Sequence, residues 1–327
     1  MRVMVTGGTG FVGGHIVRAL VDEGHEPCLL VRNEAKLRQL VELFDLPGDV
    51  AWVEGDILDG ASVARALDGA DACVHSAAFT TLDPNEMDKC LEVNGPGTEI
   101  VLGAAVAAGC DPIVHTSSIS CIFPPIGDMA DPDVDPVHSS DAPYSKSKVE
   151  SELHARALQD AGHPVLILYP GGVTGPDDLG LNVVGSYLVN ILSSDVLMAG
   201  PSGGWAIIDV RDLARAVARL MRPGLGPRRF LAQGDLMTFE EFNSALNEVS
   251  GLDRSVAAMT RDDLLQVMDE EAVDIQLDIR PGNDEPIQRE SGVTWRPQRD
   301  TLRDTVRWLV ASGYLDEKWA PAVGVSS

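Results

Sequence analysis

The chain has 327 residues, of which 44% are hydrophobic and 23% charged, as in an ordinary globular protein with room for about two domains at ~100–200 residues each. Its 50 acidic and 25 basic residues give a net charge of −25, which disfavours binding to nucleic acid or to an anionic membrane surface. Five scattered cysteines without a C-x-x-C pair indicate reduced thiols and argue against a disulfide framework or a zinc site.

The start of the chain and its hydropathy bear on its location. A strand is predicted from residue 2, which leaves no room for a signal peptide, and no apolar run approaches the ~20 residues of a membrane span. We therefore expect a cytoplasmic protein that acts on a small molecule and has no nucleic-acid or membrane partner.

A glycine-rich turn lies near the amino terminus. Residues 2–5 are an apolar run typical of a buried strand, and residues 12–20 are apolar at helical spacing, so the glycines between them occupy a strand-to-helix turn. Gly7, Gly10 and Gly13 allow the backbone to turn tightly, to approach a pyrophosphate, and to pack the helix on the strand. The pyrophosphate would lie on the unpaired N–H groups at the positive end of the helix. The pattern predicts dinucleotide binding.

The second predicted strand, residues 26–32, ends about 20 residues beyond the glycine turn, where dinucleotide-binding folds select their cofactor. An acidic residue there would bind the adenosine ribose hydroxyls and favour NAD. This chain instead has Arg32-Asn33, with Lys36 one turn further on, so a 2′-phosphate would meet positive charge. We therefore expect NADP, and NAD only if Arg32 is simply an exposed residue at the end of the strand.

Short apolar strands alternate with helical segments through the first half of the chain. Later strands are predicted at residues 50–54, 70–75, 112–116 and 166–169. Residues 84–108 are predicted to be helical apart from Gly95-Pro96-Gly97, where the proline must disturb the helix. This alternation predicts an α/β fold with a parallel, doubly wound sheet of the Rossmann type.

Residues 124–141 are rich in proline and aspartate. Three aspartates at alternate positions, 131 to 135, imitate the start of a calcium-binding loop, but Pro136 stands where glycine is required and Ala142 where the bidentate glutamate should be. We therefore expect a solvated loop and no metal site.

A tyrosine and a lysine open the next predicted helix. Tyr144 and Lys148 are four residues apart, so they lie on one face, one turn apart. An ammonium held near a phenol favours the phenolate and lowers the tyrosine pKa from its usual value of ~10. Tyr144 is therefore a candidate general acid and base, although a tyrosine ring over a lysine stem on an ordinary helix surface has the same spacing.

Seven short motifs occur in one order within residues 1–176. They are Thr6-Gly-Gly-Thr-Gly-Phe-Val-Gly13, Gly55-Asp-Ile57, His75-Ser-Ala-Ala78, Asn94-Gly-Pro-Gly-Thr98, Thr116-Ser-Ser118, Tyr144-x-x-x-Lys148 and Tyr169-Pro-Gly-Gly-Val-Thr-Gly-Pro176. As a set they resemble the extended short-chain dehydrogenase/reductase family, also called the NAD-dependent epimerase/dehydratase family, and the likeness resumes weakly at residues 208–214 and 295–309. The resemblance implies a Rossmann domain over residues 1–175, to which residues 208–232 return, and a substrate lobe over residues 176–207 and 233–327.

The resemblance also implies a role for each matching position. The pyrophosphate of the cofactor would be held by Gly7, Gly10, Phe11, Val12 and Gly13, and its adenine by Asp56 and Ile57. Ala77 and Ala78 would lie under the cofactor. The nicotinamide end would be held by Asn94, Pro170, Gly172 and Val173, and the nicotinamide ribose by Lys148. Ser118, with Ser117 as the competing choice, would bind the substrate oxygen, Tyr144 would exchange its proton, and Lys148 would tune Tyr144. Family members commonly form homodimers through the helices within residues 84–108 and 144–160, which we expect here too.

The later part of the chain bears on the substrate. No lysine or arginine occurs between Pro176 and Ile207, and apolar residues crowd positions 181–192, which indicates either an apolar pocket or a helix that feeds the core. A nucleotide-sugar enzyme must neutralise a second pyrophosphate, for which Arg254, Arg261 and Arg280 remain available. The acidic stretch 261–285 is expected to be a loop over the pocket.

The residues after the fifth strand narrow the reaction. The family's nucleotide-sugar 4,6-dehydratases carry Thr-Asp-Glu at this point, where the chain has Ser118-Ile119-Ser120, so that dehydration is not expected. We expect hydride transfer between the nicotinamide and a ketone or secondary alcohol of a fairly apolar molecule, as in the hydroxysteroid dehydrogenase and dihydroflavonol reductase-like branch. A nucleotide-sugar epimerase with the same Ser-Tyr-Lys triad and a non-catalytic cofactor-binding regulator are the alternatives.

Overall fold

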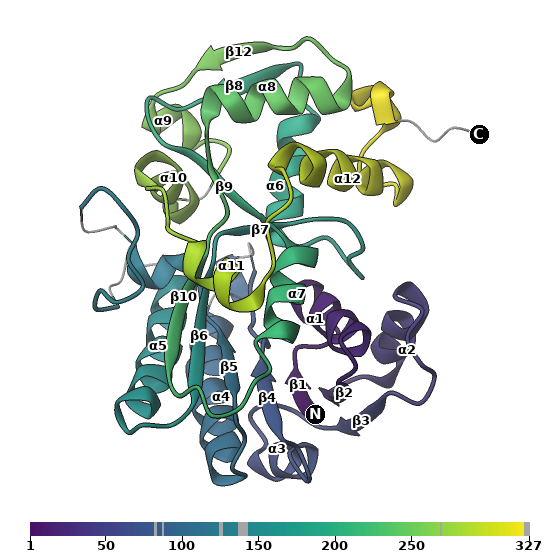
Figure 1. Cartoon of the computed structure of the whole chain (residues 1–327). Coiled ribbons are helices and arrows are strands. Elements are labelled where there is room, and N and C mark those ends of the chain that lie inside the picture. The colour runs from purple at the N-terminus through teal and green to yellow at the C-terminus, as the bar shows by residue number, and fades with distance from the viewer. Residues whose placement is uncertain (82–83, 87, 124–126, 137–142, 269, 324–327) are drawn as a thin grey trace.

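The computed structural model describes residues 1–81, 84–86, 88–123, 127–136, 143–268 and 270–323. It has a larger part built on a seven-stranded sheet and a smaller lobe above it (Figure 1). Within the described ranges, no helix combines the length and the apolar character needed to cross a membrane.

The large sheet is parallel throughout, with its strands in the order β10-β6-β5-β4-β1-β2-β3. The strands are β1 (Arg2–Thr6), β2 (Glu26–Val31), β3 (Ala51–Glu54), β4 (Ala72–His75), β5 (Ile113–Thr116), β6 (Val165–Pro170) and β10 (Arg228–Ala232). Successive strands are added outward on both sides of β1, so the predicted doubly wound α/β fold is confirmed. The strand order reverses between β1 and β4, and ligands of such sheets bind beyond the carboxyl ends of the strands at this point.

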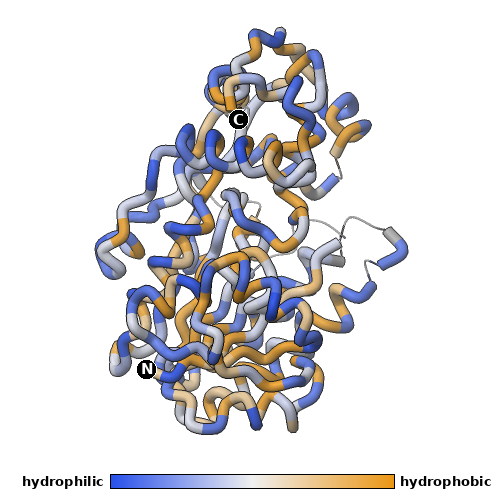
Figure 2. Tube along the Cα trace, turned by 90° about the vertical axis from the view of Figure 1, so that its right-hand side faces the viewer, coloured by the Kyte–Doolittle hydropathy of each residue, from blue (hydrophilic) through white to orange (hydrophobic). Residues whose placement is uncertain are grey.

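Helices cover both faces of the large sheet (Figure 1). One apolar core lies under α1 (Phe11–Asp22), α2 (Glu34–Leu43), α7 (Val210–Arg219) and α11 (Glu285–Ser291), and the other under α3 (Gly60–Ala66), α4 (Asp88–Ala107) and α5 (Pro143–Asp160). In β1, Val3 and Val5 belong to the first core and Met4 to the second, because successive side chains of a strand point to opposite faces. Burial on both faces explains the apolar runs by which the strands were predicted. Figure 2 shows hydrophobic segments gathered in the part that contains the large sheet.

The predicted break in the fourth helix is wrong, because α4 runs without interruption from Asp88 to Ala107 with Pro96 inside it. Proline removes only one helical hydrogen bond, and the flanking glycines allow close packing on both sides. A Cβ at Gly95 would lie 2.5 Å from the Glu150 carboxyl carbon, and a Cβ at Gly97 would lie 2.5 Å from Ile57 Cδ1. Close packing against α5 and Ile57 thus accompanies a continuous helix where the sequence alone suggested a break.

The smaller lobe has two small sheets and a core of its own. Its elements are β7 (Gly172–Thr174), α6 (Val183–Leu192), β8 (Val196–Ala199), β9 (Gly204–Asp209), β11 (Leu236–Thr238), α8 (Phe239–Ser250), β12 (Ser255–Ala258), α9 (Arg261–Leu264), α10 (Glu270–Asp278) and α12 (Gln298–Ala311). Short 3-10 helices complete the chain: η1 (Pro84–Glu86), η2 (Ile119–Ile122), η3 (Glu317–Trp319) and η4 (Pro321–Val323). The apolar stretch at 181–192 forms α6, whose Leu188 and Leu192 lie in the lobe's core.

Two stretches were expected to be loops, and the structure agrees with these predictions only in part. The acidic stretch 261–285 was expected to be a loop, but it contains α9 and α10, so that prediction is wrong. Of the proline- and aspartate-rich stretch, residues 127–136 are described, and Ala130 bridges to Gly282 of the lobe. Residues 124–126 and 137–142 lie outside the described residues. No group of three His, Cys, Asp or Glu side chains among the described residues is arranged to hold a metal ion.

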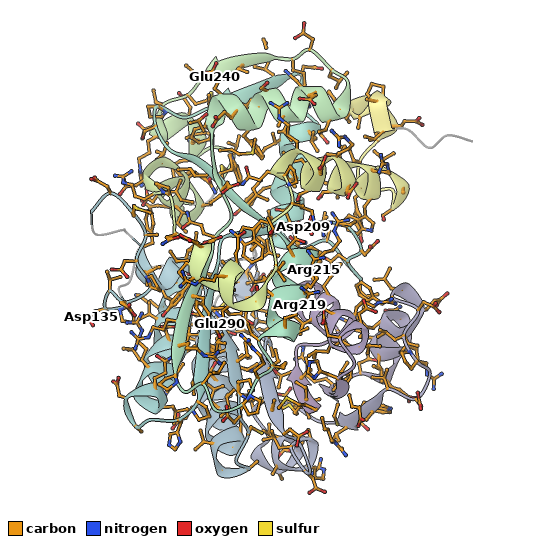
Figure 3. The ribbon with its side chains drawn as sticks, viewed as in Figure 1. Asp135, Asp209, Arg215, Arg219, Glu240 and Glu290 are labelled. Atoms are coloured by element: carbon orange, nitrogen blue, oxygen red, sulfur yellow. The ribbon has the colours of Figure 1, made fainter. Side chains whose placement is uncertain are left out.

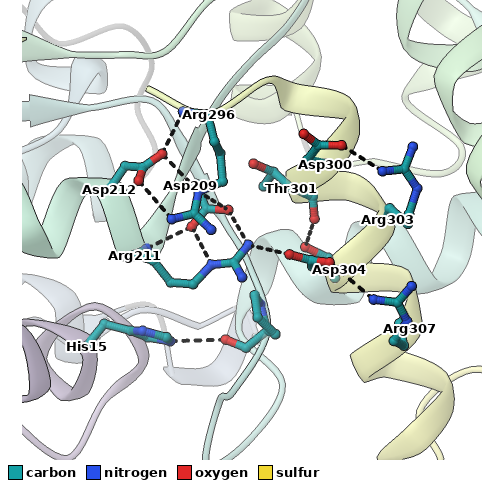
Figure 4. Close-up of polar contacts among 12 residues, drawn as sticks. His15, Asp209, Arg211, Asp212, Arg296, Asp300, Thr301, Arg303, Asp304 and Arg307 are labelled. Atoms are coloured by element: carbon teal, nitrogen blue, oxygen red, sulfur yellow. Dashed lines mark hydrogen bonds and ion pairs between the residues drawn. The ribbon is translucent and has the colours of Figure 1, made fainter. Parts of the chain in front are cut away.

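Charged side chains join the two parts where the chain passes from β9 into α7 (Figures 3 and 4). Arg211 forms ion pairs with Asp209 at 2.8 Å and with Asp304 of α12 at 2.9 Å. Arg296, which precedes α12, pairs with Asp212 of α7 at 2.8 Å. These contacts join the segments 208–214 and 295–309, in which the family resemblance resumed.

Candidate active site

The glycine turn lies at the point where the strand order reverses. Gly7 has φ of 72°, a left-handed conformation that favours glycine. A Cβ at Gly7 would lie 2.6 Å from the main-chain nitrogen of Ala77, beyond the end of β4, and one at Gly13 would overlap the Gly7 carbonyl oxygen. Gly10 caps α1 without a side-chain hydrogen bond, and the first turn of α1 holds no acidic residue. The turn is therefore shaped for a close approach by an anionic group at the helix N-terminus.

A buried histidine is hydrogen-bonded to the strand that leads into the glycine turn. His75, at the end of β4, has Nδ1 2.7 Å from Thr6 Oγ1 and Nε2 3.0 Å from Thr98 Oγ1 of α4. Ala77 N–H also donates to Thr6 Oγ1, at 3.3 Å. Burial lowers the pKa of His75 to about 3, and the nearby Lys148 charge adds to the shift, so the ring is neutral. His75 thus joins β1, β4 and α4 directly beneath the residues expected to carry the cofactor.

A second histidine lies beside the first. The His115 ring of β5 stacks on His75, with centroids 5.6 Å apart and planes 17° apart. Its two ring nitrogens are buried, and neither has a hydrogen-bond partner among the described residues. The sequence placed His75 in a family motif without giving it a role, and His115 was not singled out. The signal was present, because His75 is the last residue of the apolar strand β4, His115 is the last but one of β5, and the two stand opposite each other in the β4–β5 register.

The residues predicted for the adenine end gather at the ends of β2 and β3. The Arg32 side chain is 76% exposed, and its Nη1 lies 3.9 Å from Asp56 Oδ2. Ile57 packs against Gly97 of α4, while Lys36 is exposed on α2. Asn33 between them caps α2 by accepting a hydrogen bond from Ala35 N–H at 2.8 Å. Arg32 and Asp56 therefore lie close together at the ends of β2 and β3, and Lys36 follows on the next helix.

Asn94 holds the loop after β4 in place. Its Oδ1 accepts from Phe79 N–H at 2.7 Å, and its Nδ2 donates to Phe79 O at 3.0 Å and to Ser147 Oγ of α5 at 2.9 Å. Asn94 is buried, Ala77 is half-buried and Ala78 is exposed. The structure thus brings α4, α5 and the predicted cofactor loop together through one amide side chain.

Lys148 is fixed at the carboxyl end of β5. Its Nζ donates to Thr116 O at 2.9 Å, and the side chain is buried. Tyr144 is half-buried in the first turn of the same helix. Burial lowers the pKa of Lys148, and the nearby Cys121 and Glu152 oppose that shift. The lysine hydrogen bond therefore ties the first turns of α5 to the segment that carries the two candidate serines.

The two candidate serines differ in their surroundings. Ser117 is buried, with Oγ 3.3 Å from Cys121 Sγ. Ser118 is half-buried, and its Oγ accepts from Ser120 N–H at 3.2 Å and from Ser120 Oγ at 3.0 Å. Among the described residues, the Ser118 hydroxyl donates no hydrogen bond. That hydrogen is free to be donated to a ligand.

The last predicted group lies where β6 passes into β7. Pro170 ends β6, and Gly172 and Val173 belong to β7. A Cβ at Gly172 would lie 3.0 Å from Ala206 O of β9, so this backbone packs closely under the lobe. His15 of α1 contacts the same segment through Nε2, 3.0 Å from Pro176 O. The expected nicotinamide segment is therefore joined to the glycine-turn helix.

A doubly wound sheet with a glycine-rich turn at its switch point is typical of dinucleotide-binding proteins. The model of the NAD dependent epimerase/dehydratase family matches residues 3–231, and the chain belongs to that family. Its relatives within the family include both oxidoreductases and nucleotide-sugar enzymes.

The relatives are distant. The chain is 27% identical over 252 residues to sterol demethylase protein B of Methylococcus capsulatus, which covers 77% of this chain and 75% of that one. It is 32% identical over 212 residues to a putative dihydroflavonol 4-reductase of Synechocystis, covering 64% and 60% of the two chains. Among solved structures it is similar to DesIV, a dTDP-glucose 4,6-dehydratase of Streptomyces venezuelae with NAD and TYD bound, with a TM-score of 0.74, 27% identity and 97% and 99% coverage.

Proposed function

We propose that the protein is an NADP-preferring oxidoreductase that moves hydride between the nicotinamide and a ketone or secondary alcohol of a fairly apolar small molecule. The observation that carries this proposal is the hydrogen bond from Lys148 Nζ to Thr116 O, at 2.9 Å, which holds the Tyr144 helix against the Ser118 segment. The glycine turn suits a dinucleotide, because side chains at Gly7 and Gly13 would collide with the backbone of Ala77 and Gly7 and force the tight turn open. NADP(H) bound there would supply or accept the hydride.

Three side chains would bind the substrate oxygen and transfer its proton. Ser118 donates its free hydroxyl hydrogen to the substrate oxygen, and Tyr144 gives or takes the proton at that oxygen. Lys148 has three donor hydrogens and uses one on Thr116 O, which leaves two for the Tyr144 phenol and the nicotinamide ribose. Ser117 is less suited to the first role, because it is buried against Cys121.

The NADP preference is supported by the exposed Arg32 and Lys36, which present positive charge beside the expected ribose. The solved relative DesIV carries NAD, so the proposed preference would set this chain apart from that relative.

The three arginines that could bind a second pyrophosphate all have protein partners. Arg254 is buried and donates to Leu192 O at 2.9 Å, Ser250 Oγ at 3.0 Å and Asn247 Oδ1 at 3.0 Å. Arg261 pairs with Glu270 at 2.9 Å and Asp274 at 2.8 Å, and Arg280 pairs with Asp278. Their engagement supports a substrate without a diphosphate. The apolar residues of α6 give no such support, since they serve the lobe's core.

Assays with NADPH and a panel of ketones and nucleotide sugars test the proposal. We expect ketone-dependent oxidation of NADPH, reduced ~10²–10⁴-fold in Tyr144→Phe while cofactor binding is kept. Conversion of a nucleotide sugar without net cofactor oxidation would instead establish the epimerase alternative. Cofactor binding without any turnover would point to the regulator.

We further propose a cytoplasmic homodimer. All five cysteines are free and buried, which suits a reducing compartment. Helices α4 and α5 pack side by side, and Leu153 of α5 is 54% exposed although apolar. Sedimentation of Leu153→Glu tests the dimer, which this charge should dissociate.

A further inference from the structure

Helix α5 carries four functional side chains at four-residue spacing: Tyr144, Lys148, Glu152 and Arg156. Side chains four apart on a helix are neighbours on one face, so phenol, ammonium, carboxylate and guanidinium follow one another along it. Glu152 is fully buried, and Lys148 and Arg156 are buried as well. A charged row inside a protein needs internal compensation, because burial of an unpaired charge is costly.

The carboxylate of Glu152 is fixed on the side away from Lys148. Arg156 Nε donates to Glu152 Oε1 at 2.7 Å, and the Tyr169 hydroxyl donates to the same oxygen. Arg156 Nη2 donates in turn to Tyr169 Oη at 2.8 Å. Two main-chain oxygens, Val134 O at 2.7 Å and Pro132 O at 3.0 Å, hold the rest of the guanidinium.

The other oxygen, Glu152 Oε2, is buried and has no hydrogen-bond partner among the described residues. Arg156 and Tyr169 bind only one oxygen of the carboxylate. The other oxygen can therefore interact with a further positive charge nearby. The next charged side chain along the helix face is the Lys148 ammonium.

The other titratable groups near Lys148 do not compete for this role. Burial raises the pKa of Cys121 to about 12 and lowers the pKa of His75 to about 3. Burial also holds the pKa of His115 well below its usual range. These three groups, on η2, β4 and β5, are therefore neutral near pH 7. Among the described groups near Lys148, Glu152 is therefore the one that supplies a negative charge.

We propose that Glu152 is a positioning residue of the Tyr144–Lys148 pair: its carboxylate, held by Arg156 and Tyr169, supplies the counter-charge of the buried Lys148 ammonium. Removing that charge lowers the pKa of the buried Lys148, so the ammonium loses its proton at lower pH, and the neutral amine no longer stabilises the Tyr144 phenolate. The inference rests on the proposed function for its kinetic meaning, but its electrostatic content can be measured without a substrate.

Ultraviolet titration of the tyrosines in the full chain tests the proposal. The chain has only 4 tyrosines, and the Tyr144 phenol is assigned by subtracting the curve of the same protein carrying Tyr144→Phe. In Glu152→Gln we expect the Tyr144 titration to move to higher pH by about one unit, and in Glu152→Asp, which keeps the charge, to stay near that of the unaltered chain. Tyr169→Phe is the matched control, because it removes a hydrogen bond to Glu152 and keeps the carboxylate; its Tyr144 curve should not move.

The double variant Glu152→Gln/Arg156→Gln guards against misfolding, because it replaces the ion pair by two neutral side chains and leaves no unpaired guanidinium. It should show the same shift as Glu152→Gln. An unchanged Tyr144 curve in both Gln variants would overturn the proposal, as would an equal shift in Tyr169→Phe. If no ketone is turned over but the shift is found, the proposed function fails and the role of Glu152 stands.

Discussion

Asp212 of α7 accepts three hydrogen bonds from Arg296, a residue 84 positions later in the chain. Arg296 N–H and Nε donate to Asp212 Oδ2 at 2.7 and 3.0 Å, and Nη2 donates to Oδ1 at 2.8 Å. The Asp212 side chain is 1% exposed, so its charge depends on these partners. The pair joins the segment before α12 of the lobe to a helix that packs against α1 beneath the glycine turn.

Loss of this ion pair should destabilise the fold. Arg296→Met leaves the buried Asp212 carboxylate with Arg215 as its remaining ion-pair partner, and we expect the free energy of unfolding to fall by about 3 kcal/mol. Urea denaturation measures the change. The control is Arg299→Met, which removes an exposed ion pair with Glu248 and should cost less than about 1 kcal/mol. Equal losses in the two variants would contradict the importance of burial here.

The glycine turn gives a second prediction. In Gly13→Ala the added methyl group would overlap the Gly7 carbonyl oxygen, so the turn must open and NADPH binding should weaken by at least about tenfold. Fluorescence titration with NADPH measures the affinity. Gly103→Ala on α4 is the matched control, since no atom lies within 4 Å of its added Cβ and binding should be unchanged. Normal affinity in Gly13→Ala would show that the cofactor lies elsewhere.

Much of the fold could be predicted because its signals are local. Apolar runs mark strands buried on both faces, and the glycine turn has a spacing set by backbone geometry. The failures arose where distant residues decide the outcome: Pro96 stays helical because Ile57 and Glu150 pack against its flanking glycines. The roles of α6 and of Arg254 likewise depend on partners far along the chain. In the candidate site, the Tyr144–Lys148 spacing was visible, but the support from His75 and Glu152 requires the packed structure.

The cofactor preference can be tested at Arg32. Arg32→Ala should weaken NADPH binding by about tenfold and leave NADH binding unchanged, because only the 2′-phosphate would lose its charged partner. Arg38→Ala is the matched control: its side chain is also 76% exposed, but it pairs with Glu34 one turn away on α2. Competition titrations with the two cofactors give both affinities. Tighter binding of NADH than of NADPH in the unaltered chain, with no effect of Arg32→Ala, would refute the preference for NADP.

The two stacked histidines should make stability depend on pH. Burial lowers the pKa of His75 from 6.5 to about 3 and that of His115 well below 6.5, so both rings stay neutral in the folded chain. The unfolded chain binds protons at these positions below pH 6.5, which means that stability is lost as pH falls. The loss approaches about 1.4 kcal/mol per pH unit for each histidine.

His115→Phe isolates one of the two contributions. Phenylalanine keeps a ring against His75 and removes two buried nitrogens that have no described partner, so stability near pH 7.5 should be equal or higher. Urea denaturation at about pH 7.5 and about pH 5.5 should show a smaller loss in this variant, by about 1.4 kcal/mol. A loss as large as that of the unaltered chain would mean that His115 is protonated in the folded state, and the conclusion that His115 is a neutral neighbour of Lys148 would then be wrong.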